Sequence, residues 1–367
     1  MAPCFISSHV YRATGYGAAH PLGIPRIGTV MDICEAMGWL TVEAIVDSPR
    51  ASVDDLLKFH DADYIEALQL AETAGRVSPE VRAKYNLGGM ENPVFQGVFE
   101  RASMSVGGSI HAAELSLAGR IAYHPAGGTH HGRRDRASGF CYFNDPVFAI
   151  LTYLEHDLER VLYVDIDAHH GDGVEDAFAD DPRVFTISVH EENRWPNSGL
   201  LRDRREGRAR NLPVPKGFND TEFAYLMDDA VMPVAEQFGP QAVVITCGAD
   251  ALRGDPLSRL ELSNGALWDA VMQLVGLSVP TVVLGGGGYN PWTVARCWAG
   301  LWARISGQSI PGELPQTVRK ILSRLESDLV DEDDVEAQWL DRIADQPNRG
   351  VVRQQVRDVA SATLKAL

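Results

Sequence analysis

The chain has 367 residues, of which 45% are hydrophobic and 23% charged, so it can bury a large core and is expected to fold as a globular protein. Its 33 Lys and Arg face 50 Asp and Glu, a formal net charge of −17 that argues against nucleic acid and anionic membranes as partners, because binding a polyanion depends on basic groups. The acidic excess favours solubility, and it would also attract basic peptides or amines.

The cysteines and the N-terminal region indicate the compartment. The number of cysteines is odd and no two form a C-x-x-C pair, so the sequence suggests neither a disulfide framework nor a structural zinc knuckle. No secretion signal opens the chain, and no apolar stretch approaches the roughly 18 residues of a membrane span. We therefore expect a soluble cytoplasmic protein without a membrane partner. The five cysteines are Cys4, Cys34, Cys141, Cys247 and Cys297.

Five apolar runs rich in Val and Ile recur along the chain without alternating polar and apolar residues, which is typical of strands covered on both faces. Helix-like stretches lie between them, for example residues 219–237, which open with a possible cap at Asn219 and have Glu222 three residues later. This alternation predicts an α/β fold of three layers, with a mostly parallel central sheet and helices on both faces. The predicted strands are residues 121–123, 161–164, 184–189, 242–246 and 281–284.

Two charged segments look like surface features. Residues 202–210 form a basic run that we interpret as a solvated loop. Residues 326–345 are acidic around positions 331–334, and we expect them to connect the core to a C-terminal helix near residues 350–365. No internal repeat or Pro/Ser-rich linker divides the chain.

Polar residues follow four of the predicted strands, and in parallel sheets ligands bind at that carboxyl edge. In the segment after Val164, Asp167 and His169 stand two residues apart, so in extended chain their side chains leave on the same side. Asp250, after another strand, offers a third ligand. Two carboxylates and an imidazole leave a position free for water and substrate, as catalytic zinc requires. Aspartates at strand ends also cap helices or pair with arginines, but so dense a cluster would be costly without a cation or buried hydrogen bonds.

Two glycine-rich segments add candidate catalytic groups. His130 and His131 lie in a glycine-rich turn after the strand at residues 121–123, and paired histidines backed by acids suit proton transfer. Tyr289 follows four consecutive glycines, and a flexible loop that delivers one tyrosine suggests a hydroxyl donor for a developing oxyanion. A phosphate-binding loop would look similar, but no Gly-Lys-Ser/Thr follows the glycines here.

Taken together, five ordered motifs resemble the histone deacetylase family, in particular its class I branch and bacterial acetoin utilisation relatives. The resemblance runs from about residue 20 to about residue 305. It implies the arginase/deacetylase fold in one catalytic domain over residues 1–325, with residues 326–367 as an acidic segment and C-terminal helix packed on that domain. The motifs are residues 125–132 (PAGGTHHG), 138–145 (SGFCYFND), 163–173 (YVDIDAHHGDG), 247–250 (CGAD) with 254–256 (GDP), and 285–290 (GGGGYN).

The resemblance also implies residue roles and cofactors. Zn²⁺, with Fe²⁺ as the alternative, would bind Asp167, His169 and Asp250. The tandem histidines His130 and His131 would have Asp165 and Asp172 as carboxylate partners. Tyr289 would hydrogen-bond the substrate carbonyl, Gly139 and Phe140 would form one wall of an acyl-lysine channel, and Arg26 would lie in an internal pocket behind the metal. A structural K⁺ would be held largely by backbone oxygens at Asp165, Asp167, His169, Ser188 and Val189.

Two positions depart from the family pattern, both at the channel entrance. Trp195 stands where a second channel phenylalanine is usual, in a segment shorter than the usual loop. Glu91 stands where relatives carry a rim aspartate that grips the substrate backbone. These departures leave the reaction intact and put the substrate in question.

We therefore expect a metal-dependent amidohydrolase that removes acetyl or other acyl groups from lysine side chains by attack of a metal-bound water, with His131 as main base and acid and His130 chiefly electrostatic. Small acylated amines such as acetylpolyamines are an alternative substrate. A non-catalytic acyl-lysine binding protein is an alternative of another class, although such a protein would be expected to have lost a ligand or the tyrosine. An arginase-type ureohydrolase would need aspartates that these ligand segments lack. Oligomeric state stays open.

Overall fold

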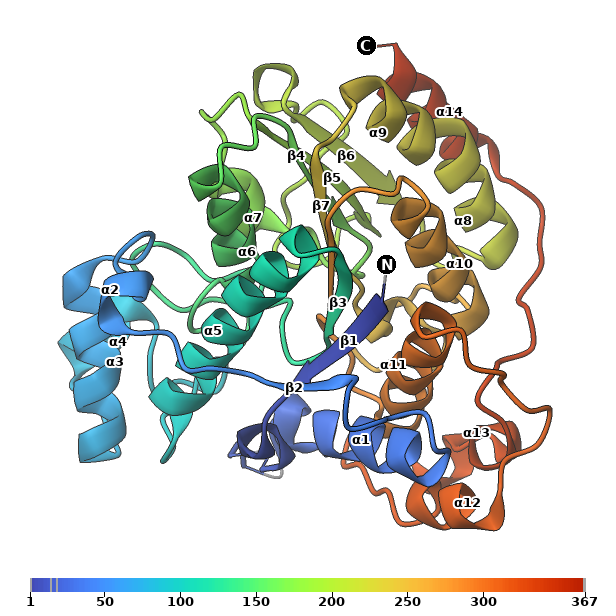
Figure 1. The fold of residues 1–367 in the computed structure, drawn as a ribbon, viewed down its shortest axis with the longest axis horizontal. Helices are drawn as coiled ribbons and strands as arrows, with labels where there is room; N and C mark the ends of the chain where they lie inside the picture. The colour runs from blue at the N-terminus through green and yellow to red at the C-terminus, as the bar shows by residue number, and fades with distance from the viewer. Residues whose placement is uncertain (1, 14, 18, 366–367) are drawn as a thin grey trace.

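A single parallel sheet of eight strands forms the centre of the computed structural model, which describes residues 2–13, 15–17 and 19–365 (Figure 1). Its strand order is β2-β1-β3-β8-β7-β4-β5-β6, and each neighbouring pair is parallel. The three-layer α/β prediction is thereby confirmed. The strands are β1 (Ala2–Ser7), β2 (Ile45–Asp47), β3 (Arg120–His124), β4 (Val161–Asp165), β5 (Val184–Glu191), β6 (Ala209–Val214), β7 (Ala242–Thr246) and β8 (Thr281–Leu284).

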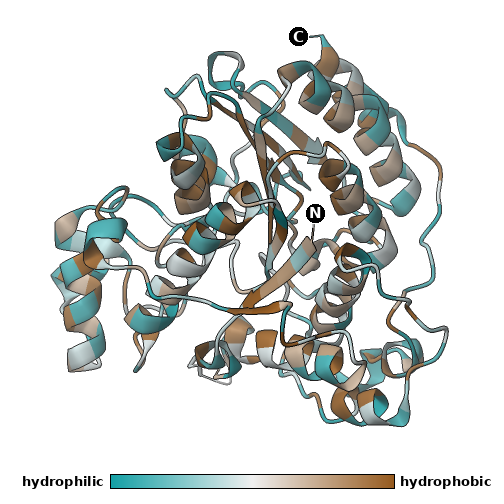
Figure 2. Ribbon diagram, viewed as in Figure 1, coloured by the Kyte–Doolittle hydropathy of each residue, from teal (hydrophilic) through white to brown (hydrophobic). Residues whose placement is uncertain are grey.

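Helices cover both faces of this sheet, and alternate residues of one strand enter different cores. Leu162 and Val164 of β4 pack into one hydrophobic cluster, while Val161 and Tyr163 pack into the other. Figure 2 shows hydrophobic residues concentrated along the central strands, with hydrophilic residues on the peripheral helices and loops. The helices are α1 (Ile27–Ala36), α2 (Val53–Leu56), α3 (Ala62–Ala74), α4 (Pro79–Tyr85), α5 (Val98–Leu117), α6 (Asp145–Glu155), α7 (Asp172–Ala177), α8 (Asp220–Leu226), α9 (Met232–Phe238), α10 (Asn264–Val275), α11 (Pro291–Ile305), α12 (Gln316–Leu322), α13 (Ala337–Asp341) and α14 (Gln354–Leu364).

The helix expected over residues 219–237 is present, and its cap is a full capping box. The Asn219 side chain accepts from the backbone N–H of Glu222, and the Glu222 carboxylate accepts from the backbone N–H of Asn219. One π-helical turn, Met227–Val231, joins α8 to α9. This turn was not predicted; Pro233, at the start of α9, lacks the N–H that a regular α-helix would use there.

The basic run at 202–210 is not wholly a solvated loop. Its last two residues, Ala209 and Arg210, begin the buried strand β6, and Arg205 pairs with Glu175 and Asp176 of α7. The expectation of a loop was wrong at that end because Arg210 can bury its stem over the Phe185 ring, with its guanidinium carbon 5.2 Å from the ring centroid.

The C-terminal segment lies against the rest of the fold at several points. Trp339 of α13 stacks on Trp292 of α11, with ring centroids 6.4 Å apart. Helix α14 packs against β6 and buries Val356 and Val359, and Figure 1 shows it beside α8 and α9. Arg353 makes two hydrogen bonds of 2.6 Å to the Glu222 carboxylate. Among the residues that the structure describes, no helix is both long and apolar enough to cross a membrane.

Candidate metal centre and active site

The parallel sheet brings the motif loops together at its carboxyl edge. The loop after β4 and the turn after β7 meet where the backbone N–H of Ala168 donates to Asp250 Oδ1 at 3.0 Å. The glycine loop after β8 joins them, since the N–H of Gly287 donates to Asp167 Oδ2 at 2.6 Å. The strand β5 also reaches this edge, since the N–H of Glu191 donates to the carbonyl oxygen of Ala168 at 2.9 Å. The side chain of His190 bonds through Nε2 to the carbonyl oxygen of Gly199.

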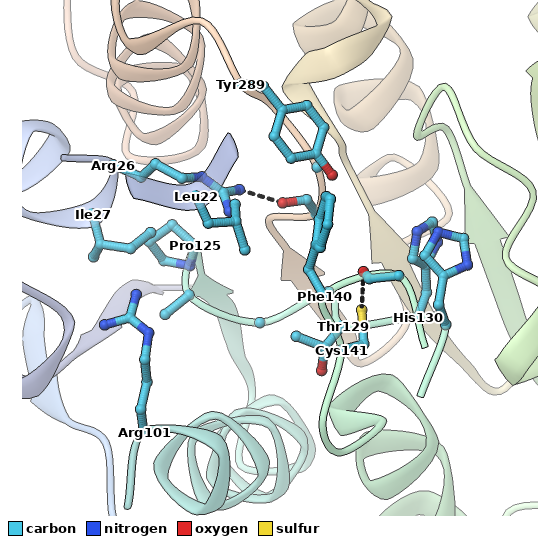
Figure 3. A pocket seen from close by; sticks show the side chains of 17 residues that line it. Leu22, Arg26, Ile27, Arg101, Pro125, Thr129, His130, Phe140, Cys141 and Tyr289 are labelled. Carbon is cyan, nitrogen blue, oxygen red and sulfur yellow. Dashed lines mark hydrogen bonds between the residues drawn. The ribbon is translucent and has the colours of Figure 1, made fainter. Parts of the chain in front are cut away.

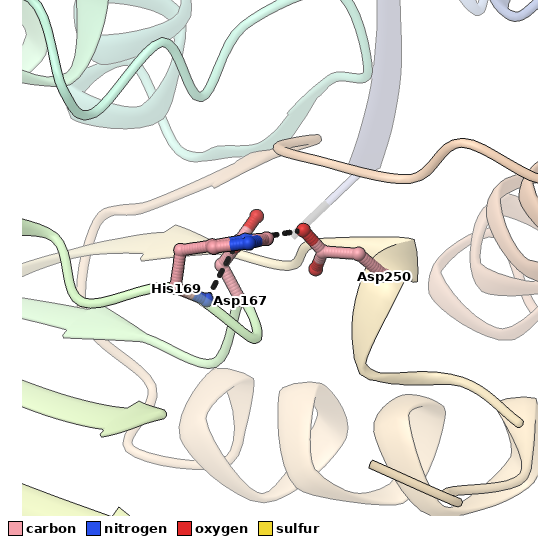
Figure 4. A group of neighbouring side chains, drawn as sticks. All are labelled: Asp167, His169 and Asp250. Carbon is pink, nitrogen blue, oxygen red and sulfur yellow. Dashed lines mark hydrogen bonds and ion pairs between the residues drawn. The ribbon is translucent and has the colours of Figure 1, made fainter. Parts of the chain in front are cut away.

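Asp167, His169 and Asp250 form a buried triad whose ligand atoms all lie within 4.8 Å of one another (Figure 4). His169 Nδ1 is 2.9 Å from Asp250 Oδ2 and 3.2 Å from Asp167 Oδ1. One imidazole and two carboxylates are a donor set found at catalytic zinc sites. Burial raises the pKa of Asp250, and repulsion from the neighbouring Asp167 carboxylate raises it further, to about 6. A cation shared between the two carboxylates would relieve this repulsion. The residues therefore fit a divalent metal ion.

The four-glycine loop is packed tightly rather than flexible, which corrects the expectation from sequence. A Cβ at Gly287 would overlap the Asp250 carboxylate, and one at Gly248 would overlap that of Asp167. The backbone N–H groups of Cys247 and Ala249 donate to the carbonyl oxygens of Gly285 and Gly287, each at 2.8 Å, and so fix the loop to the turn after β7. Glycine is needed here because the backbone approaches the carboxylates of the triad directly.

His130 and His131 each bond to a separate aspartate. His130 Nδ1 lies 2.6 Å from Asp165 Oδ2, and His131 Nδ1 lies 2.7 Å from Asp172 Oδ1. If each Nδ1 donates to its carboxylate, the Nε2 atom of each ring is left for proton transfer. The structure thus places the four residues in the pairs that the family resemblance implied.

The two histidines differ in proton affinity. Burial opposes a proton on His130, but the carboxylates of Asp165 and Asp167 outweigh it and raise the pKa of His130 to about 9. Burial and the charge of His130 lower the pKa of His131 to about 3, against the pull of Asp172. The pair therefore favours a proton on His130 and a neutral His131.

Three supporting residues were missed by the sequence reasoning. Arg133 pairs with the carboxylates of both Asp172 and Asp176, and it stands two positions after the tandem histidines. Asp145 is fully buried and accepts hydrogen bonds from the N–H groups of Gly128 and Thr129, at 3.0 and 2.7 Å, which shapes the histidine turn. Asp255 accepts from the N–H of Tyr289 at 2.7 Å. Asp145 lies in the motif at residues 138–145 and Asp255 in the motif at residues 254–256. The presence of an acidic residue in each motif could have indicated these supporting roles.

The residues expected to hold K⁺ lie on two neighbouring strands and the loop after β4. Asp165 and Ser188 are partners in the register of β4 and β5. Ser188 Oγ is 2.9 Å from His190 Nδ1. The potassium site stays a prediction.

A cavity beside the triad is lined by Tyr289, Phe140, Arg26 and both tandem histidines (Figure 3). The Tyr289 and Phe140 rings lie edge to face with centroids 5.8 Å apart. Burial raises the pKa of the Tyr289 phenol well above its ordinary value, so the group stays a neutral O–H donor. Arg26 also lines the cavity, where it donates to the carbonyl oxygen of Gly286 and lies over the Trp298 ring. Its place in a pocket behind the metal stays a prediction.

Of the expected channel residues, Gly139 and Phe140 line this cavity, while Trp195 and Glu91 contact residues of its lining. The Trp195 ring lies edge to face on His131, with centroids 4.6 Å apart, and is 40% exposed. Gly139 lies so close to Trp195 that a Cβ there would overlap the indole. Phe140 has φ +66°, a left-handed conformation that costs a non-glycine residue about 1–2 kcal/mol. Glu91 turns its carboxylate toward the protein, where Oε1 accepts from the N–H of Gly139 at 2.6 Å.

Residues 20–305 match the histone deacetylase domain model, and the chain belongs to the histone deacetylase family. It is 36% identical to histone deacetylase 8 of Xenopus tropicalis over 298 residues, which covers 79% of this chain and 80% of that protein. It is 37% identical to human histone deacetylase 1 over 310 residues, which covers 82% of this chain and 64% of that protein.

Solved structures agree with the family assignment. The crystal structure of an HDAC homolog from Aquifex aeolicus matches with a TM-score of 0.94 and 35% identity, covering 99% of this chain and 100% of that one. An HDAC homolog complexed with SAHA matches with a TM-score of 0.93, also at 35% identity, covering 99% of this chain and 100% of that one. The arginase/deacetylase fold is confirmed, and the family supports a deacetylase hydrolase.

Proposed function

We propose that this protein is a zinc-dependent deacylase that hydrolyses the amide of an acylated lysine side chain. One observation carries the proposal: the paired histidines and Tyr289 line one cavity, and Gly287 of the same lining donates its N–H to Asp167 of the buried donor triad. Membership of the histone deacetylase family supports the reaction class. Fe²⁺ is the alternative metal, and K⁺ would occupy the Asp165, Asp167, His169, Ser188 and Val189 positions.

Asp167, His169 and Asp250 would hold the metal. When bound, a divalent zinc ion supplies Lewis acidity, which polarises an amide carbonyl and makes a water molecule easier to deprotonate. The N–H groups of Gly287 and Ala168 each donate to one of the carboxylates and so orient them toward His169.

His131 would act as general base and then as general acid. Its low proton affinity keeps it neutral near pH 7, and its bond to Asp172 leaves Nε2 able to accept a proton from the attacking water. The same nitrogen would return that proton to the leaving amine. His130, with its raised pKa, would supply positive charge beside the developing oxyanion.

Tyr289 would donate its phenolic proton in a hydrogen bond to the oxygen of the attacked carbonyl. Phe140 and Trp195 would enclose the aliphatic chain of the acylated amine and exclude water from it. Because Asp255 holds the backbone of Tyr289, the donor is positioned before substrate arrives.

The testing experiment loads the full chain with Zn²⁺ and measures acetate or acyl release from an acetyl-lysine peptide, a longer acyl-lysine peptide and an acetylpolyamine. Turnover of a lysine peptide that a chelator abolishes supports the proposal. Faster turnover of the acetylpolyamine favours the small-amine alternative, for which the net charge of −17 argues. No turnover, together with measurable binding of a hydroxamate, favours a non-catalytic reader.

We further propose that the protein acts in the cytoplasm, where its five free cysteines stay reduced. Residues 1–325 would form the catalytic domain, with residues 326–367 packed onto it. The ion pair between Arg353 and Glu222 supports that arrangement.

A further inference from the structure

We propose that Glu91 is a positioning residue that holds the channel wall at Gly139 and Phe140, rather than a group that grips the backbone of the substrate. The inference rests on the proposed function, because it concerns the channel through which the acylated chain would enter. It assigns this rim carboxylate a role toward its own protein.

Both carboxylate oxygens of Glu91 are directed at protein donors. Oε1 accepts the backbone N–H of Gly139 at 2.6 Å, and Oε2 accepts from Asn86 Nδ2 at 3.2 Å. Asn86 Nδ2 also donates to the carbonyl oxygen of Ala137 at 3.2 Å. Glu91 and Asn86 together therefore tie the rim segment to both ends of residues 137–139, which lead into the channel wall.

The chain at the channel wall needs such a restraint. Gly139 and Phe140 have φ angles of +54° and +66°, two consecutive left-handed residues of which the second is not glycine. Two hydrogen bonds between Ser138 and Cys141, of 3.1 and 2.9 Å, close the turn. A charged acceptor on the Gly139 N–H is a strong hydrogen bond, and it favours this turn over relaxed alternatives.

A small movement at Gly139 would reach the reacting groups directly. Its Cα faces the His131 ring, since a Cβ there would lie 2.7 Å from His131 Cδ2. The Phe140 ring is packed between His20, with centroids 4.8 Å apart, and Tyr289, with centroids 5.8 Å apart. His20 also contacts the rim segment, because its Nε2 lies 3.3 Å from the carbonyl oxygen of Glu91.

The test compares the zinc-loaded full chain with Glu91→Ala, Glu91→Gln and Glu91→Asp variants, and with Glu66→Ala as a control for loss of an exposed acid. Two substrates are used: an acetyl-lysine tripeptide, and N-pentylacetamide, which has the side-chain length but no peptide backbone to grip. Binding of octanohydroxamic acid and amide hydrogen exchange across residues 137–141 are measured in parallel. Neither of these two readouts depends on turnover.

We expect Glu91→Ala to lower kcat/KM for both substrates by about tenfold or more, because displacing a positioned wall misaligns the reacting groups. Hydroxamate binding should weaken, and exchange at Gly139 should accelerate. Glu91→Gln keeps an oxygen for the Gly139 N–H and should recover most of the loss, whereas Glu91→Asp withdraws that oxygen and should not. If Glu91→Ala does not fold, Glu91→Asp decides by the same readouts.

If Glu91→Ala lowers kcat/KM only for the tripeptide, and hydroxamate binding and amide hydrogen exchange are unchanged, the inference is overturned. Glu91 would then bind the backbone of the substrate. Faster exchange with unchanged catalysis and binding would overturn it too, because the contact would then be structural only. If the unmodified protein hydrolyses neither substrate, the proposed function fails, while hydroxamate binding and exchange still decide the role of Glu91.

Discussion

His130 and His131 lie with ring centroids 3.9 Å apart, yet each is bonded to a different aspartate. Two imidazoles this close cannot both carry a proton without strong repulsion. Their pKa values accordingly move in opposite directions, His130 upward and His131 downward. The adjacency of two identical residues thus creates two different chemical groups.

Replacing the two histidines should have unequal effects. His131→Ala removes the neutral base and should lower kcat on an acetyl-lysine peptide by about 10²–10⁴-fold, the usual worth of a general acid–base group. His130→Ala removes a positive charge but not the base, so it should lower kcat by a smaller factor. Steady-state kinetics with zinc content checked for each variant measures the difference. A larger loss from His130→Ala would reverse the assignment.

Tyr289→Phe should lower kcat by about 10² or more, the ordinary worth of one oxyanion donor. The ring is buried and remains in the variant, and the bond from its backbone N–H to Asp255 does not involve the hydroxyl, so the fold should persist. The assay is kcat at saturating peptide, with the thermal midpoint as control. An unchanged rate would remove Tyr289 from the mechanism.

Removal of the metal should abolish turnover and lower the thermal midpoint. Asp167 and Asp250 are fully buried, and without a cation their charges repel. A ligand that binds only the folded state stabilises by about 2.7 kcal/mol at a hundred times its Kd. Calorimetry with and without a chelator, followed by readdition of Zn²⁺, measures this. The Asp250→Asn variant should neither bind zinc nor show a higher thermal midpoint when zinc is added. A normal rise of the thermal midpoint in that variant would place the metal elsewhere.

Gly139→Ala should impair catalysis through the neighbouring rings. The added Cβ would overlap Trp195 and press on His131. Adding Trp195→Ala removes one of these two overlaps, so the double variant should recover part of the activity lost in Gly139→Ala. The measurement is kcat/KM in the four-member mutant cycle. If the two substitutions lower kcat/KM in a strictly additive way, Gly139 and Trp195 are not in contact in solution.

Arg353→Ala should destabilise the protein by about 1–2 kcal/mol, less than for a fully buried pair because Arg353 is partly exposed. Burial alone would raise the pKa of Glu222, but the hydrogen bonds from Arg353 hold it below its ordinary value of 4.5. The stabilisation is therefore present above that value and is lost as pH falls through the lower, folded-state pKa. Urea unfolding of both proteins at pH 7 and at pH 3 should show the difference shrinking in acid. A constant difference would contradict the linkage.

The sequence was sufficient for the five strands at the centre of the sheet, because runs such as residues 242–246 are continuously apolar. It did not reveal β1, β2 and β6. Strand β2 has only three residues, and β6 contains Arg210, Asn211 and Pro213, so neither shows a strand pattern. Their formation depends on tertiary contacts, which no local pattern reports.

The candidate catalytic groups could be named from sequence because each follows a strand end in a distinctive motif. The supporting contacts could not. Arg133 forms ion pairs with both Asp172 and Asp176, and the Glu91 carboxylate accepts from the N–H of Gly139. Both contacts depend on the direction that a side chain takes from a loop. Spacing along the chain carries no information on such directions, and they become visible only in three dimensions.

The far edge of the sheet has a consequence for self-association. Strand β6 is the last in the strand order, and an open edge strand is a template on which another chain can add. Pro213 removes one N–H from that edge, and α14 packs against the strand. Loss of α14 would therefore uncover apolar residues of this edge strand, because Leu212 and Val214 share a hydrophobic core with Val356 and Val359 of the helix.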